Sequence, residues 1–486
     1  MSSRPVTVAR HLALCYRVPH ESHISHCAVR EREMHRGKLF GTSGIRGVVN
    51  EELSPDLCRQ VGLSLGTTLP PSSRACIATD TRTSRELIKE AVSSGLLSCS
   101  IDVVDLGILP TPALALLTRE MGFAAGIMVT ASHNPPEFNG IKLFAGDSLG
   151  YGEQEQQEIE TVFHRGRFRE GKTGKLEQAH GMKERYLSFL RGKVSLSEFS
   201  AGLRIVVDPG NGAAAGFAGD ILAGMGLHVI PVNDEPDGHF PGRSPEPKED
   251  TLQDTVAFLR EHDADLAVCF DGDADRVVFC DKEGFLGFNE CIAFISRLVI
   301  SKTGRKAVAT TVEAGILLDL AVKDLGGEVV RGRVGDVPVA HLVRKLDAAL
   351  GVEEVGVYII PEAGPYPDSI FASLVLLSRL SDAGAIRRFF RSIPRLYFEK
   401  TKVSCPNELK DRVMAGVKER ARLFAPDEVN ALDGMRLEFP DSWMLIRASG
   451  TEPVIRVISE STSQQLTDRL VTNGSELVRS LVEAGS

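Results

Sequence analysis

One pattern recurs three times along the chain and limits the folds open to it. Each copy has an apolar strand, a polar or glycine-rich loop, an amphipathic helix, a glycine and a second strand. The copies begin at Arg74 ("RACIATDTRTSRELIKEAVSSGLLSCSIDVVDLG"), Leu203 ("LRIVVDPGNGAAAGFAGDILAGMGLHVIPVN") and Arg305 ("RKAVATTVEAGILLDLAVKDLGGEVVRGRVG"). Two parallel strands need a crossover connection, which the helix supplies. The repeat therefore predicts three similar α/β domains.

Other segments extend this plan. "AAGIMVTA", "ADLAVCFDGD" and "VEEVGVYII" predict further apolar strands, and the first two end in polar loops. Because ligands gather at the carboxyl ends of strands in open α/β sheets, such loops could face one cleft. Near the C-terminus, "KTKVSCP", "MRLEFPD" and "SWMLIRASGTEPVIRVISES" predict strands, and "SQQLTDRLVTNGSELVRSLVEAG" predicts a helix. That part is typical of an α+β domain.

Glycine, lysine and proline interrupt the pattern near residues 172, 286 and 393. We expect domains at 34–172, 173–286, 287–393 and 394–486, since a chain of 486 residues is too long for one core. Residues 1–33 hold four of the twelve histidines and show no periodicity or secretory signal. They are predicted to be a disordered or non-native extension.

Charge and composition exclude several classes of protein. A net charge of −9 argues against broad nucleic-acid binding, and no apolar run is long enough to span a membrane. The nine cysteines are scattered without a CxxC pair, which favours a reducing compartment over a disulfide framework. A cytoplasmic protein with a small-molecule partner is expected.

"DGDADR" follows the strand "DLAVCF" directly. Asp271, Asp273 and Asp275 alternate, so an extended loop can turn all three carboxylates toward one point, which suits Mg²⁺. Calcium is an alternative, but Arg276 and Lys282 stand where an EF-hand loop needs glycine and glutamate. A solvated acidic turn is the other alternative.

"RASGTEPVIR" places Ser449, Gly450 and Thr451 between Arg447 and Arg456. Consecutive small residues can turn backbone N–H groups and hydroxyls toward one anion, and two arginines add charge-assisted hydrogen bonds. The segment predicts a phosphate site, with an ordinary surface turn as the alternative.

"VTASHNPPEFNGIKLF" places Ser132 beside His133. Neighbours in sequence seldom face each other, so His133 need not be a triad base. A metal site and a phosphate site together indicate phosphoryl transfer, and the sequence contains no Walker A loop or GxGxxG to bind a nucleotide donor. Ser132 itself could carry the phosphoryl group. In "ATDTRTS", Asp80 and Arg82 are expected to brace neighbouring loops.

From about Lys38 onward, "FGTSGIRG", "TASHNPPEFNGIKLF", "DGDADR" and "RASGTEP" occur in the order and approximate spacing of the α-D-phosphohexomutase superfamily, which the chain resembles. The resemblance implies three α/β domains with mixed sheets and a C-terminal α+β domain around a central cleft. It also implies reversible conversion of a sugar 6-phosphate into its 1-phosphate, through a phosphoserine and a hexose 1,6-bisphosphate that also serves as activator.

The resemblance assigns roles by motif. It implies that the phosphoserine is Ser132 and that the Mg²⁺ ligands, besides a phosphoserine oxygen, are Asp271, Asp273 and Asp275. It implies a general acid/base at Lys142, and residues around the reacting phosphate at His133, Arg276 and Arg46. The residues implied to clamp the other phosphate are Arg447, Ser449, Gly450, Thr451 and Arg456.

The sugar-recognition loop departs from the family pattern. Glu353 and Gly356 align with the family glutamate and glycine, whereas Val355 and Val357 replace a serine and a histidine. This resembles the archaeal branch that contains phosphoglucosamine mutases, so glucosamine phosphate is the favoured substrate. Mannose or glucose phosphate, a phosphatase activity and an inactive sugar-phosphate-binding protein remain alternatives, as do a monomer and a homodimer.

Overall fold

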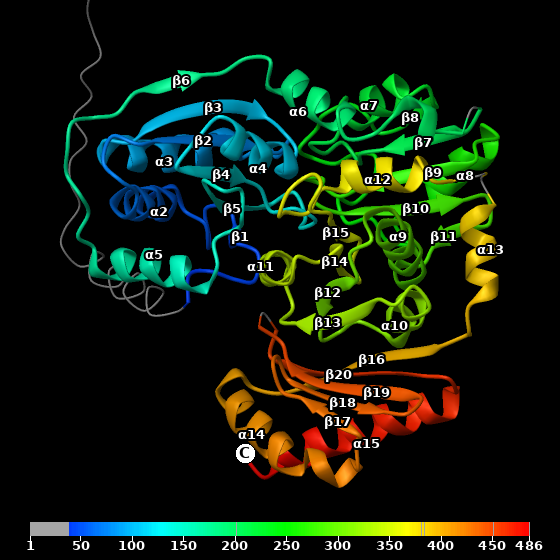
Figure 1. Ribbon diagram of the computed structural model, residues 1–486. Helices are drawn as coiled ribbons and strands as arrows, with labels where there is room; N and C mark the ends of the chain where they lie inside the picture. The colour runs from blue at the N-terminus through cyan, green and yellow to red at the C-terminus, as the bar shows by residue number, and fades with distance from the viewer. Residues whose placement is uncertain (1–37, 201, 381, 383, 451, 486) are drawn as a thin grey trace, which may run out of the picture. The chain divides into compact units, whose positions relative to one another are not determined.

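The structure is a computed structural model that describes residues 38–200, 202–380, 382, 384–450 and 452–485. The expected extension at 1–33 lies outside the described residues. The three repeats form the predicted units, since β2 pairs with β3, β7 with β8 and β12 with β13, all parallel. The three α/β domains and the C-terminal α+β domain are thus confirmed (Figure 1).

The first sheet is mixed and has the strand order β1-β5-β4-β2-β3-β6, with β1 and β5 antiparallel to their neighbours. Its elements are β1 (Ile45–Val48), α2 (Pro55–Thr68), β2 (Arg74–Thr79), α3 (Arg85–Ser98), β3 (Asp102–Ile108), α4 (Thr111–Glu120), β4 (Ala125–Val129), β5 (Phe138–Ala145), α5 (Glu153–Arg165) and β6 (Leu176–Gln178). Because β6 pairs with β3, this sheet takes in residues beyond 172.

The second sheet has the order β11-β10-β9-β7-β8. Its part of the chain comprises α6 (Met182–Arg191), a 3₁₀ turn (Leu196–Glu198), β7 (Arg204–Asp208), α7 (Ala218–Gly224), β8 (His228–Pro231), α8 (Gln253–Glu261), β9 (Leu266–Phe270), β10 (Val277–Asp281) and β11 (Gly284–Leu286). The predicted strand "ADLAVCFDGD" is β9, which ends one residue before Asp271.

The third sheet has the order β13-β12-β14-β15. Its part comprises α9 (Phe288–Thr303), β12 (Ala307–Thr311), α10 (Ile316–Lys323), β13 (Glu328–Gly332), α11 (Asp336–Leu346), β14 (Leu350–Glu353), β15 (Val357–Ile359), α12 (Ser369–Leu377) and α13 (Ala385–Ser392). The prediction of one continuous strand at "VEEVGVYII" was wrong. The segment is an antiparallel hairpin of β14 and β15, because Gly356 takes a left-handed backbone conformation (φ +84°) that breaks the strand.

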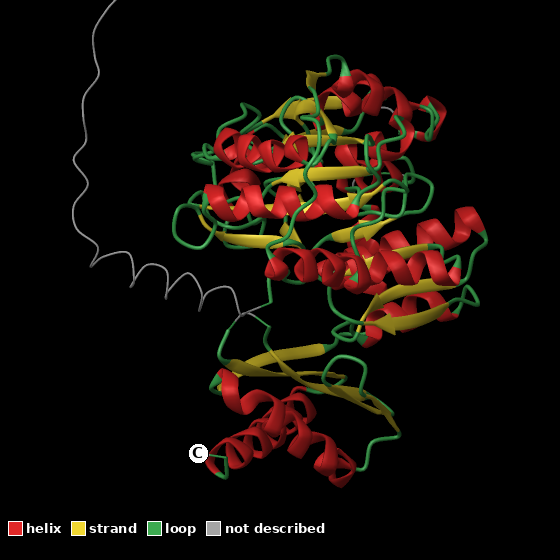
Figure 2. Ribbon diagram, turned by 90° about the vertical axis from the view of Figure 1, so that its left-hand side faces the viewer, coloured by secondary structure: helices red, strands yellow, loops and turns green. Residues whose placement is uncertain are grey.

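The fourth sheet is wholly antiparallel, with the order β16-β20-β19-β18-β17. Its part comprises β16 (Tyr397–Ser404), a 3₁₀ turn (Asn407–Leu409), α14 (Lys410–Arg420), a second 3₁₀ turn (Ala421–Phe424), β17 (Glu428–Asn430), β18 (Met435–Phe439), β19 (Ser442–Ala448), β20 (Val454–Ser461) and α15 (Gln464–Glu483). Both α14 and α15 cover one face of this sheet, and the other face is turned toward the third domain (Figures 1 and 2).

Side-chain alternation along β19 explains this arrangement. Met444 and Ile446 lie in the core that the sheet shares with α14 and α15. Trp443 and Leu445 point to the opposite face and pack against Val312 of the third domain. A strand with both faces buried shows no polar alternation, and β19 is apolar from Trp443 to Ile446.

Apolar side chains of the first three domains form one continuous core, which runs in sequence from Cys76 to Ile386. The fourth domain has its own core between its sheet and its helices. Helix ends follow local chemistry: Ser54 caps α2 before Pro55, Asp368 caps α12 and Ser463 caps α15.

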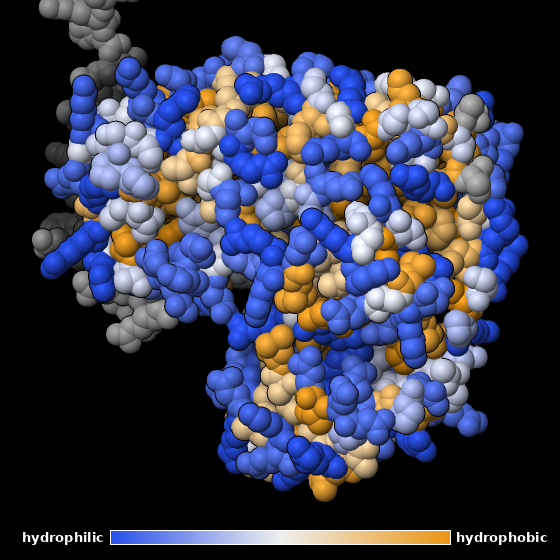
Figure 3. Space-filling model, in the orientation of Figure 1, coloured by the Kyte–Doolittle hydropathy of each residue, from blue (hydrophilic) through white to orange (hydrophobic). Residues whose placement is uncertain are grey.

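The surface and the thiols agree with the composition. Hydrophilic residues cover most of the face in Figure 3, with hydrophobic residues in small groups among them. The seven cysteines that the structure describes are buried and unpaired. Within the described residues, no helix is both long and apolar enough to cross a membrane.

Candidate active site

Ser132 lies in the loop between β4 and β5, at the carboxyl end of β4. Its backbone is left-handed (φ +52°), which costs a residue with a Cβ about 1 kcal/mol or more. Its N–H donates to Thr130 Oγ1 at 2.8 Å, and its buried hydroxyl donates to Asp271 Oδ2 at 2.6 Å. The strained turn therefore aims the hydroxyl out of the first domain and onto the loop after β9.

Arg82 holds this loop in place. Its guanidinium donates to the carbonyl oxygens of Ser132 (2.9 Å) and Phe138 (2.8 Å), and also to those of Asn134 and Pro135. Its own charge is balanced by Asp80 at 3.1 Å, and both side chains are fully buried. Arg82 and Asp80 thus brace the serine loop, as the sequence predicted for this pair.

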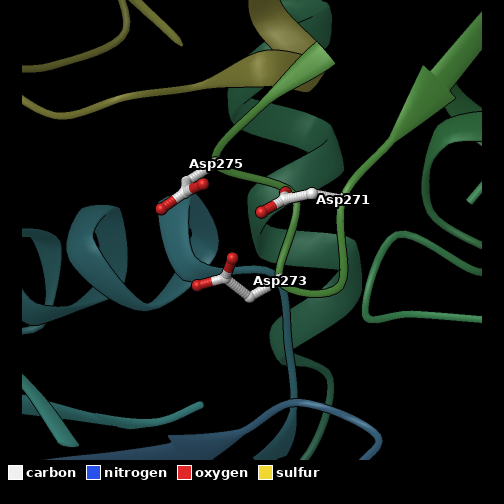
Figure 4. A group of neighbouring side chains, drawn as sticks. All are labelled: Asp271, Asp273 and Asp275. Atoms are coloured by element: carbon white, nitrogen blue, oxygen red, sulfur yellow. The ribbon is translucent and has the colours of Figure 1, made fainter. Parts of the chain in front are cut away.

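Asp271, Asp273 and Asp275 lie together, as the alternating sequence predicted, with one carboxylate oxygen of each within 4.8 Å of the others (Figure 4). All three are buried, and Asp273 Oδ1 and Asp275 Oδ1 accept no hydrogen bond. A buried carboxylate oxygen without a donor is costly unless a cation binds it. The donor set therefore fits a small divalent cation that prefers oxygen ligands.

The serine loop and the triad loop touch through backbone. A Cβ at Gly272 would lie 2.5 Å from the carbonyl oxygen of Ser132. Glycine is the residue that permits this approach, and the approach is what brings the Ser132 hydroxyl onto Asp271.

Lys142 reaches the triad from β5. Its Nζ lies 2.7 Å from Asp273 Oδ2 and 2.5 Å from Asp275 Oδ2. Burial would lower the pKa of Lys142, but these two carboxylates outweigh burial and raise it. Lys142 is consequently an ammonium at neutral pH, able to donate a proton. The same contact, together with Arg276, lowers the pKa of Asp275 to about 2 against the effect of burial.

His133 Nδ1 lies 3.2 Å from Ser132 Oγ. Because the hydroxyl proton already goes to Asp271, the hydrogen-bond network assigns the proton of this second contact to Nδ1. Burial, with the nearby charges of Arg276 and Arg46, lowers the pKa of His133 to about 2. His133 is a neutral donor to Ser132 rather than its base.

Two arginines, Arg46 and Arg276, contact the residues around Ser132. Arg46, on β1, donates to Asn134 Oδ1 at 3.0 Å, while Arg276 donates its backbone N–H to Asp271 Oδ1 at 3.2 Å. The buried Nε atoms of both side chains donate to nothing among the described residues. Buried guanidinium donors without an acceptor are what an anion-binding site requires.

A cavity of about 470 Å³ opens beside Arg276. Its walls come from all four domains, through Thr42 of the first, Arg276 of the second, Glu353 of the third and Lys400 of the fourth. The second and third sheets meet at this wall, where Val277 N donates to Gly356 O at 2.9 Å. The four-domain arrangement thus forms a cleft at the motif loops.

The predicted sugar-recognition loop contributes two acidic side chains to this cavity. Glu353 Oε1 accepts from Gly335 N at 2.8 Å, and burial followed by the nearby Asp336 raises the pKa of Glu353 to about 8. Glu354, which the sequence analysis did not select, also lines the cavity, and burial raises its pKa to about 7. Val355 stands 40% exposed at the tip, whereas Val357 is buried.

The predicted phosphate clamp lies on the fourth domain. Arg447 and Arg456 are direct partners across β19 and β20, and Arg456 lines the cavity with a buried Nε that donates to nothing described. Ser449 is buried and Gly450 exposed in the loop between the two strands. Thr451 lies outside the described residues.

Several residues of the site carry no motif in the sequence. Thr111 starts α4 and donates its hydroxyl to Asp273 Oδ2 at 2.5 Å and its N–H to Asp273 O at 2.9 Å. Lys400 and Glu313 meet in the cavity wall from two different domains. A threonine at the start of a helix after a strand is only a weak sequence signal for Thr111, and the sequence around Lys400 and Glu313 contains no such signal.

Comparison with known proteins decides the family. Models of the phosphoglucomutase/phosphomannomutase family match this chain with α/β/α domain I at residues 37–170, domain II at 184–284, domain III at 289–396 and the C-terminal domain at 401–473. The chain belongs to the phosphoglucomutase/phosphomannomutase family. The resemblance on which the sequence analysis relied is thereby confirmed.

Relatives in this family cover nearly the whole chain. A protein of Pyrococcus horikoshii named "probable phosphoglucosamine mutase" is 38% identical over 452 residues, which are 92% of this chain and 99% of that protein. A protein of Methanopyrus kandleri with the same name is 39% identical over 460 residues, with 92% and 99% coverage.

Solved structures agree with the fold. A family protein from Burkholderia thailandensis superimposes with a TM-score of 0.79 at 27% identity, covering 91% of this chain and 97% of that one. An Aspergillus fumigatus N-acetylphosphoglucosamine mutase, solved with GlcNAc-6P and magnesium, has a TM-score of 0.56 at 15% identity, covering 95% of this chain and 100% of that one. The second likeness concerns the fold alone.

Proposed function

We propose that this chain is a phosphosugar mutase that interconverts the 6-phosphate and the 1-phosphate of glucosamine through a phosphoserine at Ser132. The observation that carries the proposal is the contact of Ser132 with Asp271, whose loop also supplies Arg276 to the wall of a four-domain cavity. Lys400 and Arg456 of the fourth domain line the same cavity as a separate set of cations. A hydrolase would need one phosphate site, whereas a mutase that handles a bisphosphorylated sugar needs two.

The triad is proposed to hold Mg²⁺ through Asp271, Asp273, Asp275 and an oxygen of the phosphorylated Ser132. When bound, the ion would neutralise phosphoryl charge and polarise the P–O bond. Lys142 and Arg276 add fixed positive charge at the same place, and Arg46 offers its free Nε to the transferring group.

The proposed transfer breaks the P–Oγ bond of phosphorylated Ser132 and forms a P–O bond to the free hydroxyl of the sugar phosphate. Lys142 gives a proton to Ser132 Oγ and receives the proton that the sugar hydroxyl loses, so charge is conserved. The resulting 1,6-bisphosphate reorients in the cavity so that its two phosphates exchange places. Its other phosphoryl group is then transferred to Ser132. A trace of hexose 1,6-bisphosphate would activate enzyme that has lost its phosphate.

The preference for glucosamine is supported by the named relatives and by the acidic side chains of the cavity. Four acidic side chains line it, namely Glu290, Glu313, Glu353 and Glu354. Burial raises the pKa of Glu353 and Glu354, and an ammonium group on the sugar would favour their ionised forms and pair with them.

Phosphorus-31 NMR tests this function. The protein is supplied with Mg²⁺, a trace of hexose 1,6-bisphosphate and, in separate tubes, the 6-phosphates of glucosamine, mannose and glucose. We expect a new sugar 1-phosphate resonance, formed fastest from glucosamine 6-phosphate. Faster turnover of mannose or glucose 6-phosphate would contradict the sugar preference. Inorganic phosphate as the sole product would contradict the mutase and indicate a phosphatase, and no change in any tube would indicate a binding protein.

A further inference from the structure

Glu313 belongs to the third domain, and its side chain contacts two cations of the fourth domain. Its Oε2 lies 3.0 Å from Lys400 Nζ, and its Oε1 lies 3.3 Å from Arg447 Nη1. The Glu313 and Arg447 side chains are only 18% and 11% exposed. A single carboxylate therefore joins an ammonium and a guanidinium in the wall of the cavity.

Lys400 and the two arginines belong to one row of cations. Lys402 is the strand partner of Arg456, and Arg456 is the strand partner of Arg447, so the three side chains share one face of the sheet. Lys400 stands two residues from Lys402 on the same face. Like charges directly opposite each other destabilise a sheet unless anions separate them.

Each of these cations pairs with a carboxylate of the same chain. Glu452 accepts from Lys402 at 2.7 Å and from Arg456 at 3.0 Å, while Asp433 accepts from Arg447 Nε at 2.9 Å. The acidic partners Glu452 and Asp433 lie in the fourth domain with the cations. Glu313 alone among these acidic partners comes from another domain.

The fourth domain also holds the backbone on which Glu313 stands. Arg436 is fully buried and donates Nη1 to the carbonyls of Val312 at 2.7 Å and Ala314 at 2.8 Å, on both sides of Glu313. Its guanidinium stacks 3.9 Å from the ring centroid of Trp443, which packs on Val312. The position of Glu313 is thus coupled to the joint between the two domains.

We propose that Glu313 is an internal substitute for the non-reacting phosphate of the substrate. It neutralises Lys400 and Arg447 in the empty site, and the phosphate displaces it. Lys400 is then a further phosphate-binding residue, beside Arg447 and Arg456. The chemistry is the exchange of one carboxylate for a phosphate dianion, which offers more charge and more acceptor oxygens to the same donors. This inference rests on the proposed function, since it assumes that a phosphosugar enters the cavity.

The test measures the affinity of the full-length, unphosphorylated protein for inorganic phosphate and for glucosamine 6-phosphate by calorimetric titration. Glu313→Gln removes the competing charge and is expected to lower both dissociation constants by about tenfold. Lys400→Met is expected to raise both by about tenfold. Lys183→Met is the control, because Lys183 pairs with the exposed Asp220 of the second domain and neither residue lines the cavity, and it should leave both constants within about twofold.

The direction in which Glu313→Gln changes the dissociation constants distinguishes the proposal from a purely structural role for Glu313. If Glu313 only tied the domains together, its loss would loosen the site and weaken binding, so weaker or unchanged binding would overturn the proposal. Trp443 provides a second readout, because it is the only tryptophan of the chain and lies buried at the joint. Phosphate should change its fluorescence in the wild-type protein, and a flat signal would also count against displacement of Glu313.

The outcome is independent of turnover. Titrations that behave as expected in a protein without mutase activity would sink the proposed function and leave this inference standing. If the protein is an active mutase but Glu313→Gln and Lys400→Met leave both affinities unchanged, this inference fails and the proposed function stands.

Discussion

Ser132 Oγ lies 2.6 Å from Asp271 Oδ2, although 139 residues separate the two in sequence. The hydroxyl proton is donated to the carboxylate, and burial, followed by the charges of Asp275 and Asp273, raises the pKa of Asp271. This contact joins the first domain to the second at the point where the phosphoryl group is proposed to reside.

Ser132→Ala removes the proposed phosphoryl carrier. We expect mutase turnover to fall by at least about 10³-fold, because the variant lacks the loop hydroxyl that contacts the aspartate triad. Intact-mass spectrometry after incubation with hexose 1,6-bisphosphate should show one added phosphoryl group in the wild-type protein and none in the variant. A variant that still takes up phosphate and turns over would contradict the scheme.

Asp273→Asn removes one carboxylate of the triad. The wild-type melting temperature should rise with Mg²⁺, since a ligand at a hundred times its dissociation constant stabilises the folded state by about 2.7 kcal/mol. The variant should lose most of this rise. Asp263→Asn, at an exposed aspartate paired with Lys282, is the control and should respond to Mg²⁺ like the wild type. An equal rise in all three proteins would place the ion elsewhere.

Gly272→Ala tests the close approach of the two loops. The added Cβ would meet the Ser132 carbonyl at 2.5 Å and push the hydroxyl away from Asp271. A displacement of about 1 Å at a reacting centre costs on the order of 10²-fold in rate, so kcat should fall by that amount while the protein stays folded. In Gly219→Ala the new Cβ has its nearest neighbour at 3.9 Å, and its kcat should be unchanged.

Arg82→Met leaves the buried carboxylate of Asp80 without its partner. Removing one member of a buried ion pair costs about 3–5 kcal/mol, which urea unfolding would measure. The double variant Asp80→Asn with Arg82→Met should recover part of that loss, because no unpaired charge remains. Arg85→Met is the control, since the Arg85 side chain is 32% exposed, and should cost under about 1 kcal/mol. Equal costs for both arginines would contradict the role of Arg82.

Glu354 should make stability depend on pH. Burial, and then the nearby Glu313, raise its pKa to about 7 from 4.5, against the opposing charges of Arg331 and Arg436. The folded protein therefore binds a proton that the unfolded chain has lost. This contribution is fully present below pH 4.5 and disappears as the pH rises through about 7.

Glu354→Gln keeps a neutral side chain at every pH. The free energy of unfolding of the wild type should fall relative to that of the variant between pH 4.5 and about 7, by at most about 3 kcal/mol. Urea denaturation at several pH values measures this difference. Parallel curves for the two proteins would show that Glu354 titrates normally.

Much of the fold could be predicted from the sequence because its signals are local. A strand, a helix and a returning strand follow one another within about 35 residues, and each repeat folded as its pattern indicated. The aspartate triad was visible for the same reason, since three carboxylates in five residues need only one extended loop to meet.

The other parts depend on contacts between distant segments. The carbonyl acceptors of Arg82 lie 50 to 56 residues away in sequence, and Lys400 lies 87 residues from Glu313. No local pattern indicates which loops will meet, because that depends on how the sheets assemble. The hairpin of β14 and β15 was missed for a different reason: an apolar run with one glycine fits a continuous strand as well as a turn.

The shared core of the first three domains has a mechanical consequence. A continuous apolar interior joins them, whereas the fourth domain contacts the third through a small apolar patch around Trp443 and through polar links such as those of Arg436 and Glu460. Moving the fourth domain would therefore expose less apolar surface than separating any of the other three. A small molecule that binds at the patch around Trp443 could consequently disturb the cavity without touching Ser132.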